Sequence, residues 1–127
     1  MITSLREHIE NTLEMPVHFV HITQNESMPC ATIREVDLVS TQALARAKEG
    51  RVSGVTVTLW DLSYIDLQAA TDTLLDAYDG MYLTIGSFGC KFLLQDGSDD
   101  SYANPDGSDD WIYAKEITFS VHYRRTA

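Results

Sequence analysis

The sequence WIYAKEITFSVHY, residues 111–123, carries the longest strand pattern of this chain. Large apolar side chains alternate along it with smaller or polar ones, as expected of a strand with one buried face. The apolar face consists of Trp111, Tyr113, Ile117, Phe119, Val121 and Tyr123, interrupted by Lys115. A strand of this length spans roughly 40 Å. We therefore expect it to project beyond the core and to offer an exposed edge to another chain.

Shorter strand patterns precede this segment. Residues 52–60 alternate clearly, with Val55, Val57 and Leu59 pointing one way. Runs of β-branched and aromatic residues bounded by turn residues predict further strands at 18–22, 30–36, 82–85 and 88–94. The sheet is therefore expected to contain most of the apolar sequence.

Two segments have a helical pattern. The first covers residues 3–14, where Ser4 and Glu7 have the spacing of a capping box and Pro16 ends the helix. Its apolar face is Ile2, Leu5, Ile9 and Leu13. The second begins after Ser63 as its N-cap and runs to about residue 78, with Gly80 as its C-terminal stop. Its expected buried stripe is Leu67, Ala70, Leu74 and Tyr78.

The order of these segments predicts the fold class. Helix, strands, helix and strands give an α+β fold, with an antiparallel sheet of about four to five strands and two helices packed on one face. A chain of 127 residues and 14.2 kDa fits one domain, 1–127. Flexible loops are expected near residues 40–50 and 95–110, where polar and small residues gather.

The overall charge restricts the function. A net charge of −10 with nine basic residues argues against a protein that binds the backbone of a nucleic acid. No apolar stretch approaches the about 20 residues of a membrane span, and the first residues lack a signal-peptide pattern. We therefore expect a soluble, intracellular protein without a membrane partner.

An acidic pentapeptide occurs twice: DGSDD at residues 96–100 and again at residues 106–110. Its aspartates are Asp96, Asp99, Asp100, Asp106, Asp109 and Asp110. A calcium loop of the EF-hand type needs a central glycine and a closing glutamate, and neither frame supplies both. A solvated acidic loop between the last two strands is the main prediction. A weak calcium site, and with it a calcium-binding interaction module, remains an alternative.

Catalytic motifs are missing from the sequence. The four histidines are dispersed, and no nucleophile elbow, phosphate-binding loop or dinucleotide fingerprint occurs. Cys30 and Cys90 lack the close cysteine partner that a zinc site needs, so we expect reduced, packed thiols. The sequence therefore predicts neither an enzyme nor a protein with a cofactor or metal.

Several aromatic residues are candidates for a subunit interface. The apolar row of residues 111–123 is longer than two short helices would cover, and tryptophan and tyrosine are enriched at interfaces. The predicted oligomer or partner interface is Trp60, Trp111, Tyr113, Tyr123 and Arg124.

The segment order resembles that of a known family. A helix is followed by Met28-Pro29-Cys30-Ala31-Thr32-Ile33, then by the strand 51–60 with its pattern Val-x-Val-x-Leu-Trp. A helix ending in Asp79-Gly80 and a closing strand through Tyr123-Arg124 complete the pattern. In this order the chain resembles the tail terminator, or tail completion, proteins of long-tailed bacteriophages and the related head–tail joining proteins. The resemblance covers most of the chain, from the first helix to Arg124.

The resemblance implies a structural virion protein without enzymatic activity. Such a subunit forms a ring, expected to be a homohexamer, at the head-proximal end of the tail tube. The ring stops tube polymerisation and provides the surface on which the head docks. The implied partners are further copies of the chain, the tail tube protein and a head completion or connector protein, and assembly takes place in the host cytoplasm. A neck or head-closure connector is the alternative.

In such a ring the genomic DNA passes through the lumen without specific binding. Carboxylates facing that channel would repel phosphates. The six aspartates of the DGSDD repeats are therefore predicted to face the lumen or an axial partner.

Overall fold

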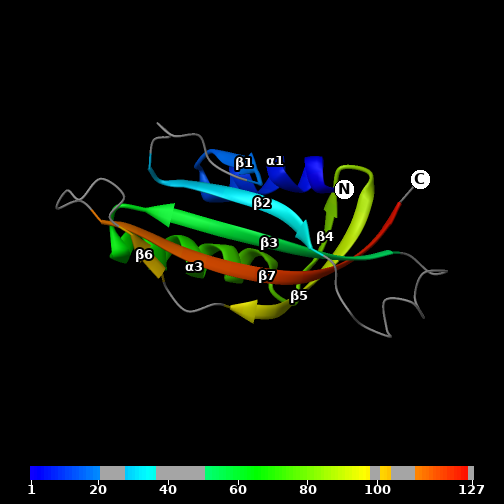
Figure 1. Cartoon of the computed structure of the whole chain (residues 1–127). Helices are drawn as coiled ribbons and strands as arrows, with labels where there is room; N and C mark the ends of the chain where they lie inside the picture. Colours follow the sequence, from blue (N-terminus) through cyan, green and yellow to red (C-terminus); the bar gives the residue numbers. More distant parts are fainter. Residues whose placement is uncertain (21–27, 37–50, 98–100, 104–110, 126–127) are drawn as a thin grey trace.

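The computed structural model describes residues 1–20, 28–36, 51–97, 101–103 and 111–125 (Figure 1). Within these ranges lie two helices, α1 (Ile2–Leu13) and α3 (Tyr64–Tyr78). The strands in the same ranges are β1 (Val17–Phe19), β2 (Cys30–Val36), β3 (Arg51–Asp61), β4 (Tyr82–Ile85), β5 (Phe88–Gly97), β6 (Ser101–Ala103) and β7 (Ile112–Arg125). The α+β class is as predicted, and the expected loop at 40–50 lies outside the described residues.

The sheet is larger than predicted and is mixed. Its strand order is β1-β2-β3-β7-β5-β4, with β6 also paired to β7. β1 runs parallel to β2, in a register that places Val17 opposite Ala31, whereas every other described pairing is antiparallel. The prediction of an antiparallel sheet of about four to five strands was wrong. The strand expected at 18–22 is β1, but its parallel pairing with β2 joins separate segments and leaves no local signal. The three-residue strand β6 is too short for a visible alternation.

The long strand β7 lies inside the sheet and not at its edge. One side of β7 pairs with β3 from Arg51↔Tyr123 to Asp61↔Tyr113. Its other side pairs with β5 and, near its start, with β6. The prediction that this strand offers an exposed edge to another chain was therefore wrong, since other strands of the same chain occupy both sides. The sheet ends instead at β1 and β4.

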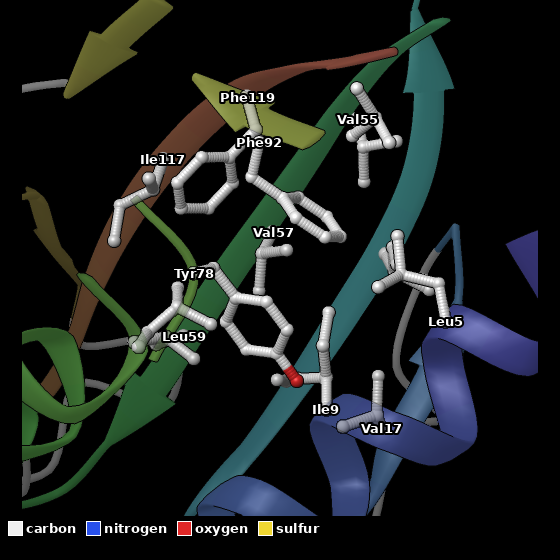
Figure 2. Close-up of a cluster of buried hydrophobic side chains, with 14 of the residues drawn as sticks. Leu5, Ile9, Val17, Val55, Val57, Leu59, Tyr78, Phe92, Ile117 and Phe119 are labelled. Carbon is white, nitrogen blue, oxygen red and sulfur yellow. The ribbon is translucent and has the colours of Figure 1, made fainter. Parts of the chain in front are cut away.

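Both helices pack on one face of the sheet, as predicted (Figure 1). The alternation in β3 and β7 directs Val57, Ile117 and Phe119 toward the helices, where all three are buried. Tyr78 of α3 lies in the middle of this core, with its ring edge-on to Phe92 at a centroid distance of 5.2 Å (Figure 2). The buried residues of α1 are Leu5 and Ile9, and those of α3 are Leu67, Thr71, Leu74 and Tyr78.

The helix ends differ in how well they were predicted. Ser63 caps α3, because its side chain accepts a hydrogen bond from the backbone N–H of Asp66 at 3.3 Å. Gly80 follows the helix with a φ of 73°, as expected of a stop residue. The capping box at Ser4 was wrong, since α1 begins at Ile2 and Ser4 lies within its first turn. The predicted Ala70 is only partly buried against the core. Thr71 is buried instead, and its hydroxyl is satisfied because it donates to the Leu67 carbonyl.

Candidate functional site

The face of the sheet opposite the helices is polar along its centre. In β2, β3 and β7, every second residue points away from the core and onto this face. Threonine is the commonest residue among them. The hydroxyls of Thr56 and Thr118 are hydrogen-bonded at 2.8 Å, and Arg34 lies 3.8 Å from Glu116. Within the described part of the chain no helix covers this face. Its central side chains Thr32, Thr56 and Ser120 are nevertheless buried. We call it the open face because no described helix packs on it.

The predicted interface residues do not come together. Trp60 is half-buried on the open face, opposite Cys30 and Ala114. Trp111 stands just before β7 and is 44% exposed. Tyr113 belongs to the same end of the sheet but is directed to the helix layer, where its ring meets Tyr64 edge-on at 5.5 Å.

The other two predicted residues lie at the opposite end of β7. Tyr123 packs on the helix side, with its ring edge-on to Phe88 at 5.6 Å. Arg124 is exposed and stands opposite Gly89 on the open face. The five residues therefore mark two ends of the molecule, and their part in an interface stays a prediction.

The acidic repeats are described only in part. Asp96 belongs to β5 and pairs with Thr118, next to a register shift after Leu94. The acidic stretch is thus not wholly a loop, because β5 continues through Gly97 and residues 101–103 form β6. Five of the predicted aspartates lie outside the described residues: Asp99, Asp100, Asp106, Asp109 and Asp110. Their placement at a lumen or axial partner stays a prediction.

An apolar cluster at the start of α3 was not predicted. Leu62 is 55% exposed and Ile65 is 79% exposed, and Tyr64 and Trp111 are also exposed. Asp61 pairs with Tyr113, so the ends of β3 and β7 place Leu62 and Trp111 at the same end of the sheet. Ile65 does not fit the buried positions 67, 71, 74 and 78 of α3, and this mismatch was the available signal in the sequence.

One edge of the sheet is closed by side chains of α1. The backbone N–H of Val17 in β1 donates to Glu10 Oε2 at 3.0 Å, and its carbonyl accepts from Arg6 Nη1 at 3.2 Å. Arg6 and Glu10 are themselves paired at 3.1 Å. Because the neighbouring backbone groups of Pro16 and Val20 bond to β2, those of Val17 point outward. The ion pair therefore occupies one donor and one acceptor that a further strand would need at this edge.

The edge at β4 has no such closure. Among the described residues β4 pairs with β5 alone, and no side chain is hydrogen-bonded to the backbone of its outer side. Tyr82 begins the strand and is 72% exposed, and Met81 beside it is also exposed. An open edge with exposed apolar side chains is typical of a surface that meets another protein.

A buried polar group joins the two helices. The Tyr78 hydroxyl lies 2.6 Å from His8 Nδ1 and 3.1 Å from the Thr12 hydroxyl. Burial raises the pKa of Tyr78 to about 12, although the hydrogen bond with Thr12 opposes that change. A tyrosine that stays neutral at ordinary pH is suited to holding α1 on α3. This arrangement offers no activated nucleophile.

The other candidates for chemistry are packed groups. Cys30 and Cys90 are buried, as predicted. Burial raises the pKa of the Cys90 thiol, and the N-terminal ammonium group opposes the rise. Within the described ranges no group of histidine, cysteine, aspartate and glutamate could hold a metal ion. The exposed surfaces of the chain therefore carry more information about its function than these packed groups.

Comparison with known proteins finds a likeness in fold but none in sequence family. No family model matches the sequence, and no curated protein matches it. Among solved structures, a chain from the virion of a native gene transfer agent particle has a similar fold. The TM-score is 0.61 at 13% identity, over 96% of this chain and 90% of that one. At this identity the likeness shows a shared fold. In the described part of the chain, none of the helices could cross a membrane.

Proposed function

We propose that this chain is a structural subunit of a phage-like virion, forming a ring at the head-proximal end of a tail tube. The observation that carries the proposal is the fold likeness to a virion chain, which spans nearly the whole of both chains. It agrees with the resemblance to tail terminator proteins in segment order. A fold by itself does not specify a function, so the argument also depends on the surfaces.

The surfaces suit a subunit of a repeating assembly. One sheet edge is closed and the other is open, so the two sides of the subunit differ. Unlike sides favour head-to-tail contacts, which close into a ring when the rotation between copies allows it. The net charge of −10 also suits a ring through which DNA moves, since carboxylates repel phosphates. Stopping the tube and presenting a docking surface would then need no catalytic group.

Deleting the gene for this chain from the particle that carries it tests the proposal. We expect tails of uncontrolled length without attached heads, seen by electron microscopy, and restoration of normal particles when the gene is supplied in trans. Mass spectrometry of purified wild-type particles should find the chain. Tails of normal length detached from heads would instead assign the neck or head-closure role. Normal particles lacking the chain would contradict any virion role.

A further inference from the structure

Two exposed surfaces of opposite charge lie on opposite sides of this chain. The first is on α3, whose sequence contains no lysine or arginine. Ala69, Asp72 and Asp76 follow one another at helical spacing and all three are exposed. Since the buried positions of α3 face the sheet, these three face away from it. We call them the acidic stripe.

The second surface is a corner of the open face, next to the β4 edge. Tyr82 pairs with Lys91, and Lys91 pairs with His122 in β7. Arg124 stands two residues farther along β7, and Tyr82, Lys91 and Arg124 are all exposed. The rows Tyr82–Lys91–His122 and Thr84–Gly89–Arg124 contain no acidic residue. We call Tyr82, Lys91 and Arg124 the basic corner.

The charges of both surfaces are unpaired within the described part of the chain. Among the described residues, neither Lys91 and Arg124 nor Asp72 and Asp76 take part in an ion pair. Cys90 and Phe92, the neighbours of Lys91, are buried on the helix side, so Lys91 is directed to the open face. The sheet therefore separates the basic corner from the acidic stripe of the same chain. The two surfaces can meet only between copies.

The spacings within the two surfaces are similar enough for long side chains to bridge. On a helix, Asp72 and Asp76 are neighbours at about 5–6 Å between Cβ atoms. On the sheet, Lys91 and Arg124 are diagonal neighbours at about 7–8 Å. Tyr82 lies beside Lys91, as the small Ala69 lies beside Asp72. Two cations and one aromatic ring can thus face two carboxylates and one small residue in the same order.

We propose that the basic corner of one copy docks on the acidic stripe of α3 in a second copy. The occupant is a second copy because one chain carries both halves of a complementary pair. At a net charge of −10, copies repel one another over most of their surface. Association therefore needs a local contact between opposite charges. The helix of the second copy would also lie beside β4 and cover the edge that the chain leaves open.

The contact is head-to-tail, because each copy uses two different surfaces. The inference rests on the proposed ring-forming role, for which it names the two surfaces that meet at each subunit boundary. Pairing of β1 with β4 is a less favourable boundary, since Arg6 and Glu10 occupy the outer groups of Val17.

Charge reversal tests the inference. Lys91→Glu with Arg124→Glu should weaken self-association about tenfold or more, measured by sedimentation and light scattering, since like charges then face each other. Asp72→Lys with Asp76→Lys should do the same. The four substitutions together, or a mixture of the two double variants, should restore association. The control is Arg34→Glu, which reverses a charge elsewhere on the open face and should leave association unchanged. Circular dichroism establishes that every variant is folded.

Three results would overturn the inference: a wild-type chain that stays monomeric up to its solubility limit, unchanged association of either double variant, or no restoration in the fourfold variant. The outcome for the proposed function is separate. Normal particles built from the Lys91→Glu, Arg124→Glu variant would remove this docking mode and leave the virion role. A chain that associates through these surfaces but is absent from particles would remove the virion role alone.

Discussion

The sheet ends in β1 on one side and in β4 on the other, and the two edges are finished differently. At β1, an arginine and a glutamate of α1 bind both outward backbone groups of Val17. At β4, the outer backbone has no described side-chain partner, and Tyr82 is exposed beside it. Unpaired edges invite association with other chains. The difference makes β4 the edge that is more readily covered by another chain, which is the contact that we propose with a second copy.

The open edge at β4 is positioned by the turn between β4 and β5, which packs against α1. Disturbing this turn should have the largest effect on stability. Gly86 has a φ of 60°, and a Cβ there would lie 2.7 Å from Ser4 Oγ. Gly86→Ala should lower the free energy of unfolding by about 2–3 kcal/mol, through backbone strain and this clash. Gly80→Ala is the control, because its φ is 73° but no atom lies within 4 Å. It should cost about 1 kcal/mol in chemical denaturation. Equal losses would mean that the turn does not pack on α1.

Opening the closed edge should have the next largest effect. Glu10→Ala removes the acceptor for the Val17 N–H and the partner of Arg6. We expect a loss of about 1–2 kcal/mol in stability and faster hydrogen exchange at the Val17 amide. Glu7→Ala is the matched control, since Glu7 is exposed and lies 3.8 Å from Arg6; it should change stability by less than about 0.5 kcal/mol. An unchanged Val17 amide would contradict the closure of this edge.

A third substitution tests the contact between α1 and α3, which lies between the two edges of the sheet. Tyr78→Phe removes the hydroxyl that contacts His8 and Thr12, and should cost about 1 kcal/mol without favouring either edge. The pKa of Tyr78 is raised to about 12, so its neutral form contributes stability below the unfolded value of 10.0. That contribution should be lost as pH rises from 10.0 toward about 12. Across this pH range, the thermal unfolding midpoint should fall less for Tyr78→Phe than for the wild type. An identical pH profile in the wild type and the variant would contradict the assignment.

The smallest effect is expected at the open edge itself. Tyr82→Thr keeps a good strand former but removes a ring that is largely exposed. Stability should change by less than about 0.5 kcal/mol, whereas self-association should weaken. A large loss of stability would show that Tyr82 is packed within its own chain, and the two edges would then be more alike than we infer.

Local patterns predicted the elements well. The bounds of β2 and β4 are those expected from sequence. Ser63 caps the start of α3 and Gly80 follows its end, as predicted from their residue types. Such features depend on neighbours in the chain, so sequence alone contains them. The apolar row of β7 was predicted correctly from Tyr113 to Tyr123, because alternation fixes which side chains share a face. Trp111, its predicted first member, lies before the strand and is exposed.

Non-local features were predicted poorly. Nothing in residues 111–123 indicates that β3 and β5 occupy both sides of β7, since pairing depends on partners far away in sequence. The closure at β1 depends on side chains seven and eleven residues before Val17. The packing of Tyr113 on Tyr64 and of Tyr123 on Phe88 could not be predicted either, because each contact joins distant segments.

The central position of β7 has a consequence for synthesis. Before β7 leaves the ribosome, β1-β2-β3 and β4-β5 are two separate groups of strands with no described pairing between them. Both groups then expose an edge that β7 later fills, along with the apolar residues that β7 helps to bury. The nascent chain therefore cannot complete its core until this segment is made. Premature contact between copies is most favoured during that interval, because exposed strand edges and apolar surface promote aggregation.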